Sequence, residues 1–563
     1  MKNTRLLLGW ILAVNIASGA HPKISPDLNA RHPDSINEVI VQFVDNPTPA
    51  QRDNPDARTS GLEMVRRHEM VKRHGGSLTV ELPFINSAVY SIPASELEGL
   101  ASEPEVSYIT PNRTLRGSID NVTAATNATQ AWSSGLTGDG VGVALIDSGL
   151  AFGQDINGTN VVYSQSWINY TIQDMYGHGT TVGGIIAGRG NASKAYGSYR
   201  NLQGVAPGAK LLNFRVLDNK GEGTDANVIA AINAAIGLKS QYNIRVMNLS
   251  LGRPVYESYT KDPLCQAVEK AWKAGIVVVV AAGNDGRDNT YGNNGYGTIA
   301  APGNDPYAIT VGAMRDMGTP TRTDDLIASY SAKGPTMIDH IVKPDIVAPG
   351  NKVVSVYAPG TYLDTTYPQN NVPGDYYLHP GSSTGSSAYF TLSGTSIATP
   401  VVSGAVALLL QYNPTLTPDQ VKAKLMLTAY KTFPVSSVAT DAVTGVQYTS
   451  YYDAFTVGAG YLDIMAAIND KTAFSGSALS PAATFNSTSK ATAPVCVTGT
   501  VCYTLPVTGT TSLWGTTSLW GTTSLWGTTS LWGTTSLWGT TSLWGTSTTD
   551  EGEATLLTIN GEN

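Results

Sequence analysis

The stretch Gly394-Thr395-Ser396-Ile397-Ala398-Thr399-Pro400 is followed by an apolar, uncharged run over residues 401–410. Such a run is typical of a helix buried in a protein core. We expect Thr395 to cap this helix and Pro400 to lie near its first turn, which places Ser396 at the helix N-terminus. Backbone N–H groups and the positive end of the helix dipole favour a negative oxygen beside such a serine. A serine near a helix start is also a common cap, so a catalytic role requires partner residues.

A histidine partner is easy to search for, because the chain contains only seven histidines. His178 alone lies in a tight frame, Gly177-His178-Gly179-Thr180, with further small residues at helical spacing after it. Small residues let a helix pack very close to its neighbours and limit the rotamers of the histidine. A histidine that serves only packing is the alternative.

A carboxylate partner is expected upstream of the histidine. Residues 141–146 form a continuous apolar run that ends in Asp147-Ser148-Gly149, the pattern of a strand buried on both faces. Ligands and catalytic groups gather at the carboxyl ends of strands in open parallel sheets, which suits a carboxylate that orients an imidazole. As an isolated motif, Asp147 is also compatible with a turn or cap.

Asp147, His178 and Ser396 follow one another in the order acid, base, nucleophile, and their three motifs resemble the signature boxes of the subtilisin-like serine proteases, the subtilase family. Further matches are Gly204-Val205-Ala206-Pro207, Asn248-Leu249-Ser250-Leu251-Gly252, Ala281-Ala282-Gly283-Asn284 and Lys343-Pro344-Asp345-Ile346-Val347-Ala348-Pro349-Gly350. The resemblance covers about residues 128–470. It implies an α/β fold, a three-layer domain with a mostly parallel central sheet.

The resemblance also implies a role for each residue of the site. Ser396 would attack the scissile carbonyl, His178 would take and return the proton, and Asp147 would fix the tautomer of the imidazole. The side-chain amide of Asn284, with the backbone N–H of Ser396, would form the oxyanion hole. For Asn284 the alternative is a loop residue in Gly-Asn-Asp-Gly turn chemistry.

The substrate should bind as an added strand along Ser250-Leu251-Gly252, by the same resemblance. This segment and Ala281-Ala282-Gly283 would wall the pocket for the residue before the cut, and neither carries a charge. We therefore expect a broad preference for uncharged or apolar side chains there. The Tyr-rich insertion at residues 357–391 is interpreted as a lid or specificity rim, with a plain solvated loop as the alternative.

The first 20 residues have the pattern of a secretory signal peptide, with basic residues, an apolar run and a small-residue end. The mature protein should therefore be secreted and extracellular, with cell-surface association as an option. No other stretch reaches the roughly 20 apolar residues of a membrane span. The formal charge of −8 argues against nucleic acid as a partner.

Residues 37–116 alternate strand and helix patterns in the order β-α-β-β-α-β. The size and position resemble the inhibitory, ferredoxin-like propeptide of subtilases, which would make it an intramolecular partner of the enzyme. An independent accessory domain is the alternative. We expect processing between Arg116 and Gln130.

The C-terminal part changes composition. Residues 471–509 form a linker rich in Ser, Thr and Ala, residues 510–546 repeat the hexamer Thr-Thr-Ser-Leu-Trp-Gly, and residues 547–563 form an acidic tail. Similar tails occur in bacterial subtilases. The repeats would suit an adhesive ribbon if extended, and a low-complexity segment without fixed structure is the favoured interpretation. Leu505-Pro506-Val507-Thr508-Gly509 matches a sortase motif by letter but lacks the apolar stretch that follows such a signal.

No spacing of cysteines or histidines indicates a metal site, and the proposed catalysis needs no cofactor. Structural calcium is common in the family, and Asp174 and Asp324-Asp325 are its candidate ligands, with solvated carboxylates as the alternative. Cys496 and Cys502 could close a small loop, which would leave Cys265 free and buried.

The sequence thus predicts a secreted serine endopeptidase that acts on protein and peptide substrates. Two other functions stay open at this stage. One is a catalytically silent subtilase scaffold that binds surfaces through its tryptophan repeats. The other is an esterase or transpeptidase that uses the same acyl-enzyme chemistry.

Overall fold

The computed structural model divides the 563-residue chain into two compact units, residues 1–115 and 116–563. It describes residues 21–25, 28, 35–44, 61–82, 86–111, 119–194, 198–290, 293–378, 388–441, 444–486, 491–495 and 561–562.

The N-terminal unit has the strand and helix order that its sequence predicts. Its elements are β1 (Ile36–Phe43), α2 (Gly61–Arg73), β2 (Ser77–Leu82), β3 (Ser87–Pro93), the 3-10 turn η2 (Ala94–Glu96), α3 (Leu97–Ala101) and β4 (Val106–Pro111). The strands form one antiparallel sheet in the order β2-β3-β1-β4. The alternate residues Val39, Val41 and Phe43 of β1 face a core that also takes in Met70 and Val71 of α2. The unit is therefore a small α+β fold of the ferredoxin-like type.

The C-terminal unit is built on an eight-stranded, mostly parallel sheet, which confirms the predicted α/β class. The strands are β5 (Gly142–Asp147), β6 (Val161–Ser166), β7 (Lys210–Arg215), β8 (Ile244–Leu249), β9 (Val277–Ala281), β10 (Ile309–Arg315), β11 (Leu326–Ile327) and β12 (Ile346–Pro349). Their order is β11-β10-β9-β8-β5-β7-β6, with β12 also paired to β10, and only the β10–β11 pair is antiparallel. Strands β5 and β9 are buried at every position, as continuous apolar runs predict.

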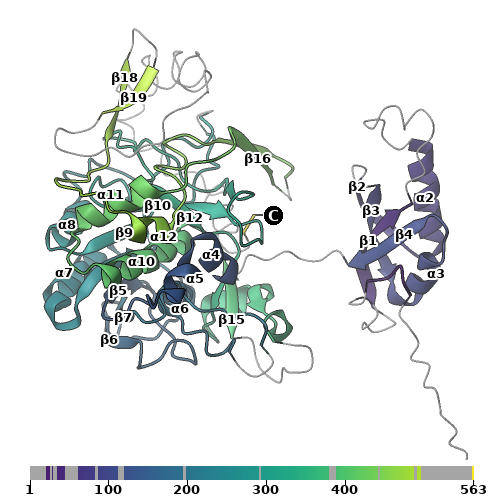
Figure 1. The fold of residues 1–563 in the computed structure, drawn as a ribbon, viewed down its shortest axis with the longest axis horizontal. Helices are drawn as coiled ribbons and strands as arrows, with labels where there is room; N and C mark the ends of the chain where they lie inside the picture. The colour runs from purple at the N-terminus through teal and green to yellow at the C-terminus, as the bar shows by residue number, and fades with distance from the viewer. Residues whose placement is uncertain are drawn as a thin grey trace, which may run out of the picture. The chain divides into compact units, whose positions relative to one another are not determined.

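Helices cover both faces of this sheet and make three layers (Figure 1). On one face α7 (Asp225–Tyr242) packs on β5 and β8, and α8 (Pro263–Lys273) packs on β9. On the other face α10 (Thr395–Tyr412) crosses the central strands, and α6 (His178–Ala187) packs beside it on β5 and β7. The two helices whose first residues include His178 and Ser396 are therefore neighbours on one face of the sheet.

Smaller elements complete the C-terminal unit. They are α4 (Ile119–Ala125), α5 (Ala128–Ser133), β13 (Val353–Val356), α9 (Tyr362–Thr366), η3 (Pro368–Asn370), β14 (Asn371–Val372), η4 (Gly374–Tyr376), β15 (Tyr389–Leu392), α11 (Pro418–Thr428), β16 (Ser436–Thr440), β17 (Gln447–Tyr451), α12 (Ile464–Asn469), β18 (Ala482–Asn486) and β19 (Ala491–Val495). Helix α4 belongs to this unit, because Ile119 and Val122 are buried in its main core. The core thus begins at least at Ile119.

Helix α10 corrects two sequence expectations. Its cap is Gly394, whose φ of 136° suits glycine, and Thr395 is the first helical residue. Pro400 lies inside the helix, not in its first turn, so the carbonyl of Ser396 lacks the usual N–H partner four residues on. Among the described helices, α10 alone is long and apolar enough to cross a membrane, and 83% of its most apolar window is buried. Here it is the core helix of the unit.

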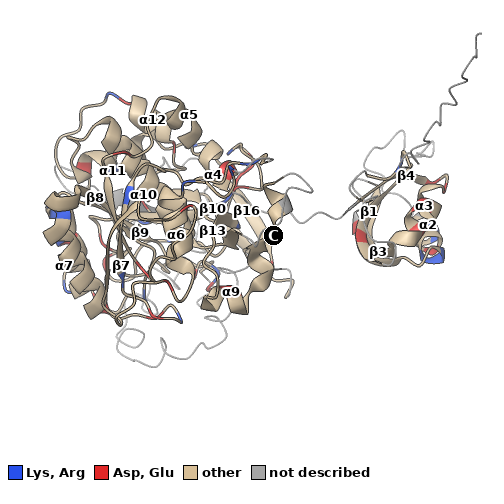
Figure 2. Cartoon of the chain, turned by 90° about the horizontal axis from the view of Figure 1, so that it is seen from below, with Lys and Arg blue, Asp and Glu red and all other residues tan. Residues whose placement is uncertain are grey.

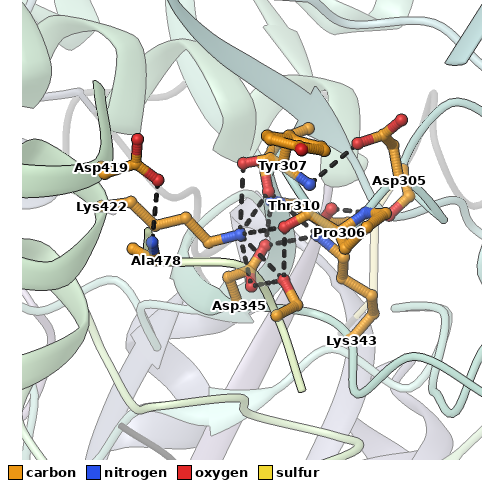
Figure 3. A network of polar contacts seen from close by, with 12 residues as sticks. Asp305, Pro306, Tyr307, Thr310, Lys343, Asp345, Asp419, Lys422 and Ala478 are labelled. Atoms are coloured by element: carbon orange, nitrogen blue, oxygen red, sulfur yellow. Dashed lines mark hydrogen bonds and ion pairs between the residues drawn. The ribbon is translucent and has the colours of Figure 1, made fainter. Parts of the chain in front are cut away.

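Charged residues are sparse along the ribbon, as a content of 14% Asp, Glu, Lys and Arg implies (Figure 2). A few are nevertheless fully buried. Lys343 and Asp345, just before β12, meet Lys422 of α11 in a closed network (Figure 3). Asp345 lies 2.7 Å from the Lys343 Nζ and 3.2 Å from the Lys422 Nζ, and it accepts a 2.5 Å hydrogen bond from Ser480.

This network shifts the titration of its members. Burial would raise the pKa of Asp345, but the charges of Lys343 and Lys422 lower it below the ordinary value. Burial lowers the pKa of Lys422 to about 7, although Asp345 opposes the change. Lys422 also donates to the carbonyls of Pro306 and Ala308, each at 2.8 Å. The network therefore fastens α11 and Ser480 to the edge of the sheet.

We predict that Asp345→Asn lowers the free energy of unfolding by about 3–5 kcal/mol, because it removes the carboxylate that pairs directly with the buried Lys343 and Lys422. Urea unfolding followed by fluorescence measures the change. Asp419→Asn is the matched control, since Asp419 is only partly buried and accepts from Ser477 and Ala478 without contacting a cation there. Equal destabilisation by both variants would contradict a structural role for the buried charges.

Candidate active site

Asp147 ends the buried strand β5, at the carboxyl edge of the sheet. Its side chain is fully buried, and Oδ1 accepts the backbone N–H of Ser148 at 2.7 Å. Its Oδ1 and Oδ2 atoms lie 2.8 Å and 3.1 Å from Nδ1 of His178. The strand therefore delivers a buried acceptor to one nitrogen of the imidazole.

His178 is the first residue of α6, after Gly177 with a φ of 110°. The helix start lies unusually close to the end of β5, because a Cβ on Gly179 would fall 2.3 Å from the carbonyl oxygen of Gly149. Only glycine allows that approach. The close contact sets the His178 ring between the end of β5 and the start of α10.

Ser396 completes a chain of polar contacts across three elements. Its Oγ lies 3.1 Å from Nε2 of His178, whose other nitrogen faces Asp147. With Nδ1–H donating to Asp147, Nε2 is the basic nitrogen and can accept the hydroxyl proton. This arrangement can convert the serine into a nucleophile.

The electrostatics of the histidine suit proton transfer. Burial alone would lower the pKa of His178, but the negative charge of Asp147, its hydrogen bond and the charge of Asp174 together raise the pKa above its ordinary value. The side chain keeps 13% of its surface exposed. The imidazolium that forms when Ser396 loses its proton is therefore stabilised by two nearby carboxylates.

Asn284 follows β9 and faces the same space as Ser396. Its Oδ1 accepts the backbone N–H of Thr395 at 2.9 Å and the Thr395 hydroxyl at 3.1 Å, which leaves Nδ2 on the other side of the amide. A Cβ on Gly394 would lie 3.0 Å from Ser396 Oγ and 3.6 Å from Asn284 Nδ2, so both atoms border one small space. An N–H donor beside the serine oxygen can stabilise an oxyanion.

The structure places Asp174 beside the start of α6, a position that the sequence did not indicate. It was a candidate calcium ligand, yet it is buried and both oxygens are taken by protein donors. Oδ1 accepts from Ser148 Oγ, Tyr176 N and Gly177 N, and Oδ2 accepts from the N–H and hydroxyl of Thr180, all within 3.0 Å. The sequence feature that could have indicated this position is the place of Asp174 four residues before His178. Asp174 ties the end of β5 to the start of α6.

The other candidate calcium ligands also have protein partners. Asp324 accepts the hydroxyl of Thr319 at 3.0 Å, and the buried Asp325 accepts that of Tyr461 at 2.6 Å. No three His, Cys, Asp or Glu side chains in the described part of the chain are grouped so as to hold a metal ion. Each of the three carboxylates named from the sequence therefore has at least one protein donor on it.

A cleft of about 720 Å³ contains His178, Asn284 and Ser396. The predicted substrate segment Ser250-Leu251-Gly252 lines it, as do Ala281 and Gly283. Ala282 does not, because it is fully buried and packs with Ile299 and Ala332. Alternation along the end of β9 turns its side chain away from the cleft.

Charged residues also border the cleft, although none came from the two predicted wall segments. Glu222, Asp225, Arg253 and Asp285 line it. Arg253 lies 2.8 Å from Asp225 and 2.9 Å from the buried Asp262, so its charge is neutralised within the protein. Glu222 is exposed on the loop before α7.

The insertion at residues 357–391 contacts the histidine segment. Tyr362 and Leu363 donate backbone N–H groups to the carbonyls of Met175 and Tyr176, at 3.1 Å and 3.0 Å. The ring of Tyr362 stacks on that of Tyr176, and Leu363 lines the cleft. The first part of the insertion is thus a structured edge of the cleft, whereas residues 379–387 lie outside the described ones.

Several sequence predictions fall outside the described residues. These are the signal peptide at residues 1–20, the pair Cys496 and Cys502, the motif at residues 505–509, the repeats at residues 510–546 and the acidic tail except residues 561–562.

Cys265 is buried and free, and its Sγ donates to Asn304 Oδ1 at 3.3 Å. Burial raises the pKa of its thiol, so it behaves as an inert core residue.

Comparison with known proteins gives consistent matches. The model of the subtilase family matches residues 138–460. Serine protease AprX of Bacillus subtilis is 39% identical over 355 residues, which cover 61% of this chain and 73% of that protein. Subtilisin E of the same species is 30% identical over 377 residues, covering 66% and 82%. The extracellular serine proteinase of a Thermus species is 31% identical over 383 residues, covering 66% and 74%.

We predict that Asp174→Asn lowers kcat roughly 10- to 100-fold, because an amide cannot accept all the donors that hold the His178 helix start in place. The acid limb of the pH profile of kcat/KM should also move to lower pH, since the charge of Asp174 raises the pKa of His178. Hydrolysis of a chromogenic peptide across a pH series measures both effects.

The matched control is Asp155→Asn. Asp155 is equally buried and accepts from Tyr389 at 2.7 Å and from Ala192, but it is not among the groups that shift His178. This control should lose stability and keep the pH profile. An unchanged profile in Asp174→Asn would contradict the positioning role.

Proposed function

The chain belongs to the subtilase family and is a serine-type endopeptidase, and we propose that it cleaves peptide bonds through Asp147, His178 and Ser396. The observation that carries this proposal is the unbroken contact from the Asp147 carboxylate through both ring nitrogens of His178 to the Ser396 hydroxyl. Three separate elements converge to make it. A structural serine at a helix start would not require this convergence.

The reaction proceeds in two halves. Ser396 Oγ attacks the scissile carbonyl carbon while His178 Nε2 takes the hydroxyl proton, and the carbonyl oxygen becomes an oxyanion. The Asn284 amide and the backbone N–H of Ser396 at the start of α10 hold that oxyanion. His178 then returns the proton to the leaving amine as the C–N bond breaks, and water repeats the sequence to hydrolyse the acyl-enzyme. The scheme uses no cofactor.

Substrate recognition rests on the backbone of Ser250-Leu251-Gly252, where an extended peptide adds as a strand. Ala281 and Gly283 contribute only small groups to the cleft near the serine. This supports a broad preference for uncharged side chains before the cut. The edge formed by Tyr362, Leu363 and Tyr176 gives the neighbouring part of the cleft an aromatic rim.

The N-terminal unit is proposed to be an inhibitory propeptide, removed by self-processing after folding. Its ferredoxin-like sheet and its place before the catalytic unit support this role. Because Ile119 and Val122 are already part of the catalytic core, the processed bond is proposed to lie within residues 112–118. The pattern of residues 1–20 and the extracellular relative support secretion.

We predict that exported wild-type protein loses its N-terminal unit and digests casein, whereas Ser396→Ala stays full length and inert, because only the serine oxygen can form the acyl-enzyme. Gel mass and N-terminal sequencing measure processing, and the new N-terminus should lie no later than Ile119. Ser133→Ala, an exposed serine outside the cleft, serves as control and should be processed normally. Processing of the Ser396 variant would overturn the assignment.

We predict that Asn284→Ala lowers kcat roughly 10²–10³-fold with little change in KM, the magnitude known from subtilisin for the loss of its oxyanion-hole asparagine. The donor acts on the oxyanion and much less on the ground-state carbonyl, so the effect belongs in kcat. Steady-state kinetics on a short peptide anilide measure it. Asn191→Ala, outside the cleft, should retain the parent values, and a pure KM effect in Asn284→Ala would contradict the role.

A further inference from the structure

The last two described residues, Gly561 and Glu562, lie against the catalytic unit, where Figure 1 marks the C-terminal end. Glu562 is only 5% exposed, although it follows a long acidic and repetitive segment. A buried carboxylate is costly unless it is paired and hydrogen-bonded. Glu562 should therefore have cationic and hydrogen-bonding partners around its carboxylate.

The Glu562 carboxylate is held by two arginines and a serine. Oε1 lies 2.7 Å from Arg287 Nη2 and accepts the hydroxyl of Ser329, and Oε2 accepts the backbone N–H of Ser329 at 3.0 Å. Arg315 Nη1 is 3.6 Å from Oε2. The side chains of both arginines are at least 90% buried, and Arg287 also pairs with Asp441 through Nη1 at 2.9 Å. Two buried guanidinium groups thus face two carboxylates, Asp441 and Glu562.

The backbone of the dipeptide is recognised as well. The side-chain amide of Asn351 donates to the carbonyl of Glu562 at 3.1 Å and accepts its N–H at 2.8 Å. Gly561 has a φ of 73°, and a Cβ there would lie 2.5 Å from both Lys352 Cγ and Ser393 Oγ. The position accordingly admits glycine and little else.

We propose that Arg287, Arg315, Ser329 and Asn351 form a carboxylate-recognition site that captures a Gly-Glu segment, and that its ligand is the chain's own Gly561–Glu562. The charge, the paired amide and the steric limit at Gly561 select the two residues together. The site is separate from the substrate cleft, because none of its four residues lines the cleft.

The site is connected to the loops of the active site. Arg287 stands three residues after Asn284, and Gly286 donates its N–H to the carbonyl of Tyr330, next to Ser329. Gly561 packs on Ser393, which accepts the Lys352 N–H at 2.8 Å and precedes Ser396 by three residues. Docking therefore braces the two loops that carry the oxyanion donor and the nucleophile, a consequence that rests on the proposed function.

Docking of Glu562 is a second attachment of the C-terminal part of the chain to the catalytic unit. The first attachment is at the start of β18, where Val342 N donates to Pro481 O at 2.8 Å and Ala483 N donates to His340 O at 2.7 Å. The second is the arginine site, which holds Glu562. The chain therefore contacts the catalytic unit both before the repeats, at residues 481–483, and after them, at residues 561–562.

Hydrogen exchange of the full-length Ser396→Ala protein tests docking without any dependence on catalysis. The peptic fragment that contains Glu562 should exchange at least roughly tenfold slower than an unstructured peptide. Gly561→Ala and Glu562→Gln should each remove this protection, one by sterics and one by charge. Gly552→Ala and Glu553→Gln are the matched controls and should keep it, and the fragments of β8 and β9 report whether the fold is intact.

The docking proposal would be refuted if the fragment with Glu562 exchanged as fast as an unstructured peptide in the parent protein. It would also be refuted if both Gly561→Ala and Glu562→Gln kept full protection. In the enzyme with Ser396 intact, Gly561→Ala and Glu562→Gln should lower kcat a few-fold on a short peptide anilide with KM unchanged. Lost protection with an unaltered kcat would overturn the bracing of the active-site loops. An inactive parent enzyme would count against the proposed function alone, because the exchange result is obtained without activity.

Discussion

The site depends on one constraint, the close packing of α6 and α10 against a parallel sheet that is covered on both faces. Strands β5 and β9 are apolar and buried up to their last residues, so the polar groups that they supply to the site come from where they end. These groups are Asp147 at the end of β5 and Asn284 after the end of β9. Gly179 then lets the start of α6 approach the segment after β5, because a Cβ there would lie 2.3 Å from the carbonyl oxygen of Gly149. The hydrogen-bond distances between Asp147, His178 and Ser396 therefore follow from how closely the backbones of these elements pack.

The buried Asp174 shows how that packing is locked. It accepts donors from the strand end and from the helix start at once, so neither segment can shift without breaking hydrogen bonds in a region closed to water. Its charge also acts on His178. Asp174 thus influences both the position of the His178 imidazole and its pKa.

Much of this could be predicted from sequence, because motifs and apolar runs are local signals. The strand before Asp147, the helix after Ser396 and the β-α-β-β-α-β order of the N-terminal unit were predicted correctly. Misjudged features depend on tertiary context. The direction of the Ala282 side chain depends on the alternation of residues along β9. The position of Pro400 within α10 depends on where the helix begins, which the backbone conformation of Gly394 decides. The burial of Asp174 depends on contacts from two elements that are distant in sequence. Glu562 meets Arg287 across 275 positions, a separation at which no local pattern carries information.

The contact of Glu562 has a temporal consequence. Residues 561–562 leave the ribosome after every other element described here, yet they pack against Ser393 and against the loop that follows Asn284. The nucleophile loop therefore receives its last support only when translation has passed the repeats. A nascent or truncated chain that ends before Gly561 already carries Asp147, His178, Asn284 and Ser396, and under the proposed docking it lacks only this contact.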